Sequence, residues 1–382
     1  MSLRTPAGFI RPGFDPLKNP DAPTSVSATG GDATASVSFT APANVGGSAI
    51  TAYYAVSNPG QVTATSATSP ISVTGLTNGT AYTFQVWGLN TYGPGVWSSA
   101  SGSVTPAAAR GLWAGGTSSN VIDYITIATT GGATDFGDLT AARRDLAGCA
   151  SSTRGLFGGG DASALIDYVT IPSAGNATNF GNLTATMTEA SACNSATVGI
   201  FSQGANINQV TIATTGNATF FGSLSTPVAA AAGCSSSTRG LFGGGGSNNI
   251  IQYITIASTG NSVTFGRLTL TARNRPGACS NSTRGVWAGG NDGGTKVNNI
   301  DYVTIATTGN ATDFGDLTSV WEWCPGASST TRGVYGGGDK GSTTSSLTYI
   351  TIATTGNSTS FGNLTIARTE LAACSNANGG LQ

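Results

Sequence analysis

Short runs of alternating apolar and polar residues recur along the chain, separated by turns rich in Gly, Ser, Thr and Pro. Four such runs, at residues 35–39, 50–56, 71–73 and 82–87, lie in the first hundred residues, and β-branched or aromatic residues fill their apolar positions. Alternation with a period of two is typical of a strand with one buried face. We therefore predict an all-β protein.

Internal repetition dominates residues 108–382. In its clearest copy, a Gly-Leu-Phe-Gly-Gly run at residues 155–159 precedes strand candidates at residues 166–171 and 180–184 and a short run ending at Cys193. Four short strands in 40–50 residues are typical of a propeller blade. The first glycine of the repeat occurs six times, at Gly111, Gly155, Gly199, Gly240, Gly285 and Gly333. We predict a six-bladed β-propeller in which the run ending at Cys374 completes the blade that begins at Arg110.

Residues 21–107 resemble a fibronectin type III domain. The resemblance rests on the segments 20–23 and 53–54 and on Gly75-Leu76 followed by Tyr82. It implies a β-sandwich of about seven strands in which the Tyr82 hydroxyl binds upstream backbone as a tyrosine corner. Phe39 takes the place of the core tryptophan that is usual in the family.

The repeats resemble kelch repeats, because an apolar strand ending in two glycines, a tyrosine strand and an aromatic strand follow one another in that order. Phenylalanine stands where the kelch pattern has tryptophan, at Phe136, Phe180, Phe221, Phe265, Phe314 and Phe361.

Residues 1–20 combine four prolines with apolar side chains. Prolines at this density exclude a helix and a central strand. We interpret the segment as an extended arm that anchors the protein to a partner through Phe9, Ile10, Phe14 and Leu17. A disordered leader is the alternative.

Composition excludes several classes of function. The 382 residues include 56 glycines and no histidine, only 9 % are charged, and the net charge is −1. A Ser-His-Asp triad and a histidine-ligated zinc are therefore impossible, and we predict no enzyme activity, cofactor or metal. We expect no nucleic-acid binding and no membrane insertion, since basic blocks and long apolar runs are lacking. The six cysteines, one per repeat, are predicted to be buried free thiols.

The repeat pattern breaks most strongly in the last two units. Their loops at residues 291–299 and 339–346 are expanded, and two tryptophans stand in the linker at residues 319–324. In a propeller these connections share one face. We predict a cluster there that binds a sugar or a protein, made of Trp321, Glu322, Trp323, Asp292, Lys296, Asp339 and Lys340. The alternative is that the tryptophans fill a local packing gap.

One repeat position carries arginine in five of the six units and Val198 in the third. A ring of arginines could bind an anion, or each could pair locally within its own unit. The five residues are Arg110, Arg154, Arg239, Arg284 and Arg332.

The arm, the sandwich module and the glycine-rich repeats together resemble structural proteins of tailed-phage virions, especially those of marine and cyanobacterial phages. The resemblance implies a virion protein, assembled in the host cytoplasm, that displays the propeller for adhesion to a host glycan or protein. The arm would bind other virion proteins of the capsid or tail, in a symmetric oligomeric assembly. A decoration or cement protein is the alternative, and a propeller enzyme acting on glycans is a remote one.

Overall fold

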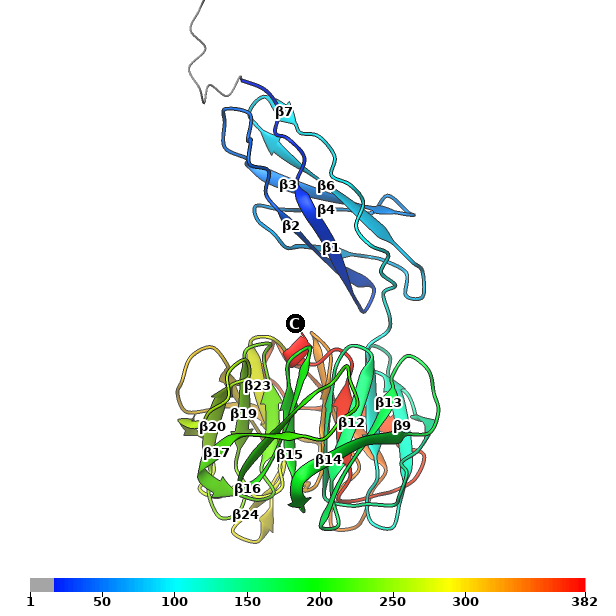
Figure 1. Cartoon of the computed structure of the whole chain (residues 1–382). Helices are drawn as coiled ribbons and strands as arrows, with labels where there is room; N and C mark the ends of the chain where they lie inside the picture. Colours follow the sequence, from blue (N-terminus) through cyan, green and yellow to red (C-terminus); the bar gives the residue numbers. More distant parts are fainter. Residues whose placement is uncertain (1–16, 382) are drawn as a thin grey trace, which may run out of the picture. The chain divides into compact units, whose positions relative to one another are not determined.

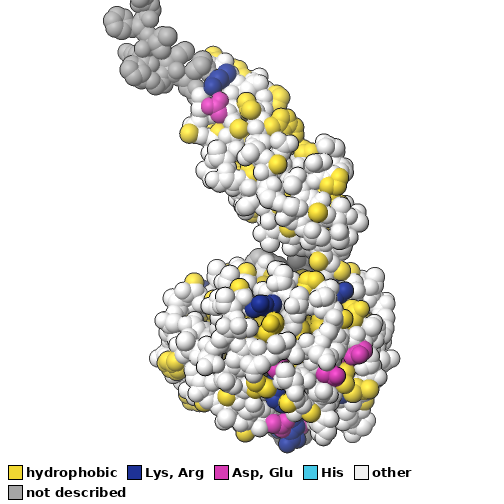
Figure 2. All heavy atoms as spheres, turned by 45° about the vertical axis from the view of Figure 1, so that its right-hand side comes forward, with side chains coloured by type: hydrophobic (Ala, Val, Ile, Leu, Met, Phe, Trp, Pro, Cys, Tyr) yellow, Lys and Arg dark blue, Asp and Glu magenta, His cyan; other side chains and the backbone are white. Residues whose placement is uncertain are grey.

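The computed structural model describes residues 17–381, which divide into two compact units, with the boundary in the sequence between Ala108 and Ala109. Strands make up both units (Figure 1). The described residues contain one short 3-10 turn, η1 (Gly379–Leu381), and no helix among them is long and apolar enough to cross a membrane. The predicted all-β fold is confirmed. Charged side chains are sparse on the face shown in Figure 2.

The first unit is built from two antiparallel sheets. One has the strand order β1-β2-β5 and the other β4-β3-β6-β7. The strands are β1 (Thr24–Gly31), β2 (Thr34–Thr40), β3 (Ala52–Asn58), β4 (Thr63–Ser66), β5 (Ile71–Thr74), β6 (Thr83–Asn90) and β7 (Gly93–Pro94). The four runs predicted from alternation all coincide with strands.

The core of this unit follows from the alternation, because every second residue of β2, β3 and β6 is buried. Phe39 lies in that core with its ring 4.7 Å from the ring of Tyr53. The backbone N–H of Thr77 donates to the Tyr82 hydroxyl at 3.0 Å. The predicted tyrosine corner is thus present.

Within its described residues the second unit contains six antiparallel sheets of three or more strands, of which five have four strands and one has three. In hydrogen-bonded order, the first sheet consists of β32 (Ala372–Ser375), β8 (Arg110–Ala114), β9 (Val121–Thr126) and β10 (Thr134–Asp138). The second consists of β11 (Leu146–Ala150), β12 (Arg154–Gly159), β13 (Ser163–Thr170) and β14 (Thr178–Met187). The third consists of β15 (Ser191–Asn194), β16 (Val198–Thr211) and β17 (Thr219–Val228).

The remaining sheets follow the same order. The fourth consists of β18 (Ala232–Ser235), β19 (Arg239–Gly243), β20 (Ile250–Thr255) and β21 (Val263–Arg267). The fifth consists of β22 (Gly277–Ser280), β23 (Arg284–Ala288), β26 (Asn299–Thr304) and β27 (Thr312–Asp316). The sixth consists of β28 (Gly326–Ser328), β29 (Arg332–Gly336), β30 (Ser346–Thr351) and β31 (Thr359–Asn363). The expanded loop of the fifth unit adds the small hairpin β24 (Asn291–Asp292) and β25 (Thr295–Lys296).

The first sheet combines the two ends of the repeat region. The C-terminal β32 pairs with β8, with Cys374 opposite Leu112. We call β32, β11, β15, β18, β22 and β28 the inner strands, because each contacts the next one in this order and β28 contacts β32. Hydrophobic clusters fill the spaces between consecutive sheets, and one of them joins Trp113 of the first sheet to Val334 and Leu347 of the sixth.

The third unit departs from the predicted four strands. Its sheet has three strands, because the single long β16 occupies the places of the second and third strands of the other sheets. It lacks the double glycine that follows the apolar run elsewhere, because Gln203 stands in place of the first of the two glycines.

Five sheets share an arginine that stacks on a tyrosine of its own sheet and donates hydrogen bonds to backbone carbonyls of the next sheet. The guanidinium of Arg239, for example, lies 4.8 Å from the ring centre of Tyr253 and donates to the Ile305 and Ala306 carbonyls of the next sheet at 3.0 and 2.8 Å. Arg110, Arg154, Arg284 and Arg332 make the equivalent contacts. The third unit has Val198 and Gln209 at these two positions, so both partners are lost together. We therefore assign the five arginines a structural role.

All six cysteines are free and buried, as predicted. Five occupy one position of an inner strand and pack against the repeat glycine of the next sheet. A Cβ atom on Gly285 would lie only 2.8 Å from the Sγ atom of Cys234, so this position requires glycine. The expectation of one equivalent cysteine per repeat is wrong for Cys324, because the strand register places Ala327 at that position.

Buried ion pairs cross three of the boundaries between sheets. Arg143, Arg273 and Arg368 precede an inner strand, and they bind Asp167, Asp301 and Asp123 of the following sheet at 2.7, 2.9 and 2.5 Å. All six side chains are at most 4 % exposed. At the other boundaries the pairs of positions hold neutral residues, which are Met187 with Asn208, Val228 with Gln252, and Trp321 with Thr348.

Candidate functional site

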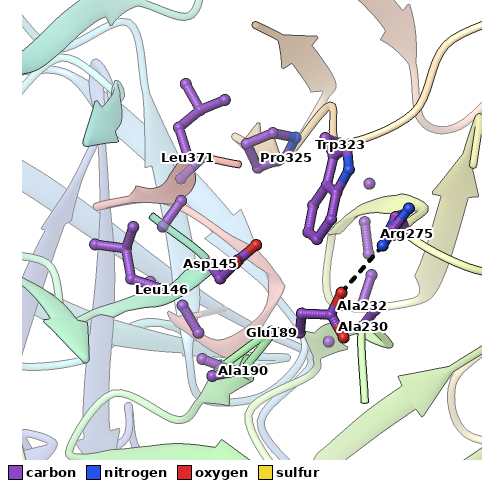
Figure 3. Close-up of a pocket in the computed structure, with 18 of the residues that line it drawn as sticks. Asp145, Leu146, Glu189, Ala190, Ala230, Ala232, Arg275, Trp323, Pro325 and Leu371 are labelled. Carbon is purple, nitrogen blue, oxygen red and sulfur yellow. Dashed lines mark hydrogen bonds and ion pairs between the residues drawn. The ribbon is translucent and has the colours of Figure 1, made fainter. Parts of the chain in front are cut away.

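A small cavity of about 100 Å³ opens where the inner strands begin (Figure 3). Each sheet contributes one residue at the same repeat position to its wall. We call these six residues the mouth ring, and they are Asp145, Glu189, Ala230, Arg275, Trp323 and Glu370.

All six residues of the mouth ring have positive φ angles, between 53° and 62°. This conformation is uncommon for residues other than glycine. Backbone hydrogen bonds to the preceding ring residue accompany this conformation at four of the six positions. The N–H groups of Arg275 and Trp323 donate to the carbonyls of Ala230 and Arg275 at 3.0 and 3.2 Å. Asp145 donates in the same way to Glu370, at 2.8 Å. The backbone thus sets the geometry, and the side chains are free to differ.

The mouth ring holds both charge and an aromatic surface. Nη2 of Arg275 lies 3.3 Å from Oε1 of Glu189, and the Arg275 guanidinium lies 4.6 Å from the centre of the Trp323 ring. Glu370 accepts from Oγ1 of Thr117 at 2.8 Å and pairs with Arg144 at 3.3 Å. In Figure 3 the Arg275–Glu189 pair and Trp323 lie across the cavity from Leu146.

Asp145 differs from the other two carboxylates of the ring. Its Oδ1 atom is buried and has no hydrogen-bond partner in the described part of the chain. Partial burial raises the pKa of Asp145 to about 6, and the negative charges of Glu370 and Glu189 add to this effect. Of the three ring carboxylates, this one is left without a cation at hydrogen-bond distance.

A polar network extends from the mouth ring to the expanded loops. Glu322 lies 4.0 Å from Arg275 and 3.4 Å from Lys296, and Lys296 binds Asp339 at 2.7 Å. The pKa of Asp339 is lowered, chiefly by this hydrogen bond from Lys296. The sequence prediction that these loop residues cluster is confirmed for Glu322, Lys296 and Asp339.

Asp292 does not join that network. Its Oδ1 atom accepts from Oγ1 of Thr271 and from the backbone N–H of Ala272, at 3.2 and 3.1 Å. Lys340 lies near the network, but its ammonium group rests 3.8 Å from the centre of the Trp321 ring. Asp292 is therefore a loop-capping residue in this structure.

Trp321 is fully buried, so it cannot stack on a ligand, and the prediction that it belongs to the binding cluster is corrected. It occupies the position that Arg273 holds in the previous unit. Its Nε1 donates to the Gly337 carbonyl at 2.5 Å, just as Arg368 donates to the equivalent Gly115 carbonyl at 3.0 Å. The alternative reading, that this tryptophan fills a packing position, is the correct one. Trp323 is only partly buried and lines the cavity.

Three of the four predicted anchoring residues, Phe9, Ile10 and Phe14, lie outside the described residues. Leu17, the fourth, is 66 % exposed.

Further along the inner strands, serine hydroxyls link one sheet to the next. Ser280 donates to the carbonyl of Ser235 at 2.8 Å, and Ser328 donates to that of Ser280 at 2.7 Å. A second, smaller cavity lies at this level, and Asn378 just before η1 lines it. Asn378 donates to the Ser375 carbonyl at 2.9 Å, so the C-terminal turn is fixed beside this end of the inner strands.

Of the mouth ring, the sequence prediction included only Trp323. The prediction did not include Asp145, Glu189, Arg275 and Glu370, because it rested on loops of unusual length and these residues lie in linkers of ordinary length. A usable signal exists, since each of these four residues stands four positions before the cysteine of its repeat.

Comparison with known proteins identifies the first unit. The fibronectin type III domain model matches residues 21–103, so these residues form such a domain. Among curated proteins, none matches this sequence. A solved structure titled "Structure of YjhT" is similar, with a TM-score of 0.53 and 8 % identity over 62 % of this chain and 88 % of that one. At this identity the similarity concerns the fold alone.

Proposed function

We propose that the second unit is a six-bladed, kelch-like β-propeller. The cyclic order of contacts among the inner strands supports this architecture, as does the pairing of β32 with β8. Pairing the C-terminal strand into the first sheet covers the edge of β8, and an exposed strand edge is a hazard for β proteins.

We further propose that the chain is a non-enzymatic protein of a phage virion that attaches the particle to its host. One observation carries the binding role: six equivalent positions surround a cavity, and they hold five different residue types although the scaffold around them repeats. A purely structural disc needs no such variety at its centre. Recognition residues carried by a rigid scaffold are a common arrangement in binding proteins.

In this proposal the arm of residues 1–20 binds other virion proteins, and the cavity together with the network of Glu322, Lys296 and Asp339 contacts a host glycan or protein. Polar groups beside a partly exposed aromatic ring suit such recognition, because tryptophan and arginine dominate binding energy at many interfaces.

The decisive experiment uses purified virions of the phage whose genome encodes the chain. Antibody raised against the full chain should label the particles, and the purified chain should bind host cells and compete with the particles. A variant without residues 1–19 should still bind cells but fail to enter particles. Labelled particles with no cell binding would favour the decoration role, and unlabelled particles would overturn the virion assignment.

A further inference from the structure

The mouth ring contains an unbalanced carboxylate at the wall of the cavity. Arg275 neutralises Glu189, and Glu370 is held by Arg144 and Thr117. Asp145 retains a buried oxygen without a donor. A buried carboxylate oxygen is costly unless a proton or a cation satisfies it. The charged groups that act on Asp145 are Glu370, Glu189, Arg144 and Asp161.

The rest of the wall is apolar and made of small side chains. Ala147, Ala190, Ala192, Ala231 and Ala232 line the cavity, together with leucines and prolines. Such a wall offers methyl groups to a ligand and few side-chain hydrogen-bonding groups. A sugar ring would bring hydroxyls that need polar partners, whereas an alkyl chain would not.

We propose that this cavity receives a lysine side chain of a partner protein, with the ammonium group against the Asp145 carboxylate and the aliphatic stem along the alanine wall. The inference rests on the proposed binding function and names the ligand group of the same site. Lysine matches both features, because it places a compact charge at the end of a flexible four-carbon stem.

The test is calorimetric titration of the purified full chain with Nα-acetyl-lysine N-methylamide. The uncharged norleucine analogue and glucosamine serve as comparison ligands. We expect the lysine compound to bind at about pH 7.5 and to lose affinity at about pH 5, where Asp145 becomes protonated. The norleucine analogue should not bind. Tighter binding of glucosamine would assign the site to amino sugars instead, and absence of lysine binding up to about 10 mM would also overturn the proposal.

Two variants locate the binding. Asp145→Asn should weaken the lysine compound at least tenfold, while the exposed Asp135→Asn should leave its affinity unchanged. Ala230→Trp should block the cavity without disturbing the fold, because Trp323 already occupies the same backbone conformation in another unit. Unchanged affinity in both cavity variants contradicts the proposal.

The result of the lysine-binding test can be distinguished from the result of the host-attachment test. If the lysine compound binds but neither cells nor particles engage the chain, the attachment function fails and the ligand assignment stands. If cells bind the chain and Asp145→Asn has no effect on that binding or on the lysine compound, attachment uses another surface and the ligand assignment fails.

Discussion

Arg273 and Asp301 face each other across the boundary between the fourth and fifth sheets, with Nη1 2.9 Å from Oδ2 and both side chains fully buried. The aspartate also accepts from Oγ1 of Thr269 at 2.6 Å, and the guanidinium donates to the Asn299 carbonyl at 2.6 Å. Wherever a unit lacks this arginine, the facing position also lacks the aspartate. The repeats thus vary the two positions together and leave no single buried charge there.

Because both charges are buried, the effect on stability of substituting either residue should depend strongly on whether its partner is present. Asp301→Asn should lower the free energy of unfolding by about 3–5 kcal/mol, because it leaves a buried guanidinium without its counter-charge. Adding Arg273→Met should recover most of the loss, since Met187 and Asn208 already form this neutral pair elsewhere. Denaturant unfolding of both variants measures the difference. A double variant no more stable than Asp301→Asn would contradict the prediction.

Truncation of the two neighbouring tryptophans should destabilise the protein to very different extents. Trp321→Ala removes a fully buried ring and its hydrogen bond to Gly337, so we expect a loss of about 3–5 kcal/mol in unfolding free energy. Trp323→Ala removes a partly exposed ring and should cost about 1 kcal/mol or less. Thermal melting compares them directly, and similar losses would show that both rings belong to the core.

Glycine at the repeat position is expected to be a packing requirement. Gly285→Ala would bring a methyl group against Cys234 and should destabilise the protein by about 1–3 kcal/mol. Gly309→Ala is the matched control, because an added Cβ there meets no atom within 4 Å. Equal stability of the two variants in denaturant titration would show that the sheets can separate to admit the methyl group.

Asp145 should make the protein less stable as the pH rises. Its pKa is raised to about 6 in the folded state, so between its unfolded value and this value the folded chain binds more protons than the unfolded chain. Stability from this group is therefore greatest below the unfolded pKa and is lost as the pH rises through about 6. Asp145→Asn should raise the melting temperature at neutral pH and change it little at pH near 4. A melting temperature lowered at neutral pH would refute this sign.

Removal of residues 371–382 should unfold or aggregate the second unit. The truncation deletes β32 and exposes the edge of β8, which then lacks its partner strand. Size-exclusion chromatography and circular dichroism of the truncated chain provide the measurement. A monomeric, cooperatively melting product would mean that β32 is dispensable.

Much of the fold could be predicted because it depends on local patterns. Alternation located the strands around Phe39, Tyr54 and Tyr82, and the spacing of the repeat glycines located the six sheets. Burial of the cysteines followed from the same periodicity. Cys324 misled this reasoning, because its neighbour Ala327 holds the repeat position and only the strand register shows it.

The site was harder to predict, because its residues are brought together by the ring order of the sheets. Asp145 and Glu370 are 225 positions apart in sequence, yet Asp145 donates a backbone hydrogen bond to Glu370. Trp321 was misjudged because an unusual residue in a linker suggests a surface function. Trp321 stands at the repeat position of Arg273, and Thr348 stands at the position of Asp301. The Trp321–Thr348 pair therefore replaces a buried ion pair with two neutral residues.

The positive φ angles of the mouth ring show that the backbone conformation at these six positions does not depend on which side chain is present. Alanine, tryptophan, arginine and acidic residues adopt the same backbone conformation there, fixed by hydrogen bonds that involve no side chain. Duplication of a repeat can therefore copy the scaffold intact, while a single codon change at any of the six positions changes the lining of the cavity and keeps these backbone hydrogen bonds. For the binding function proposed above, this means that a new specificity requires only one substitution.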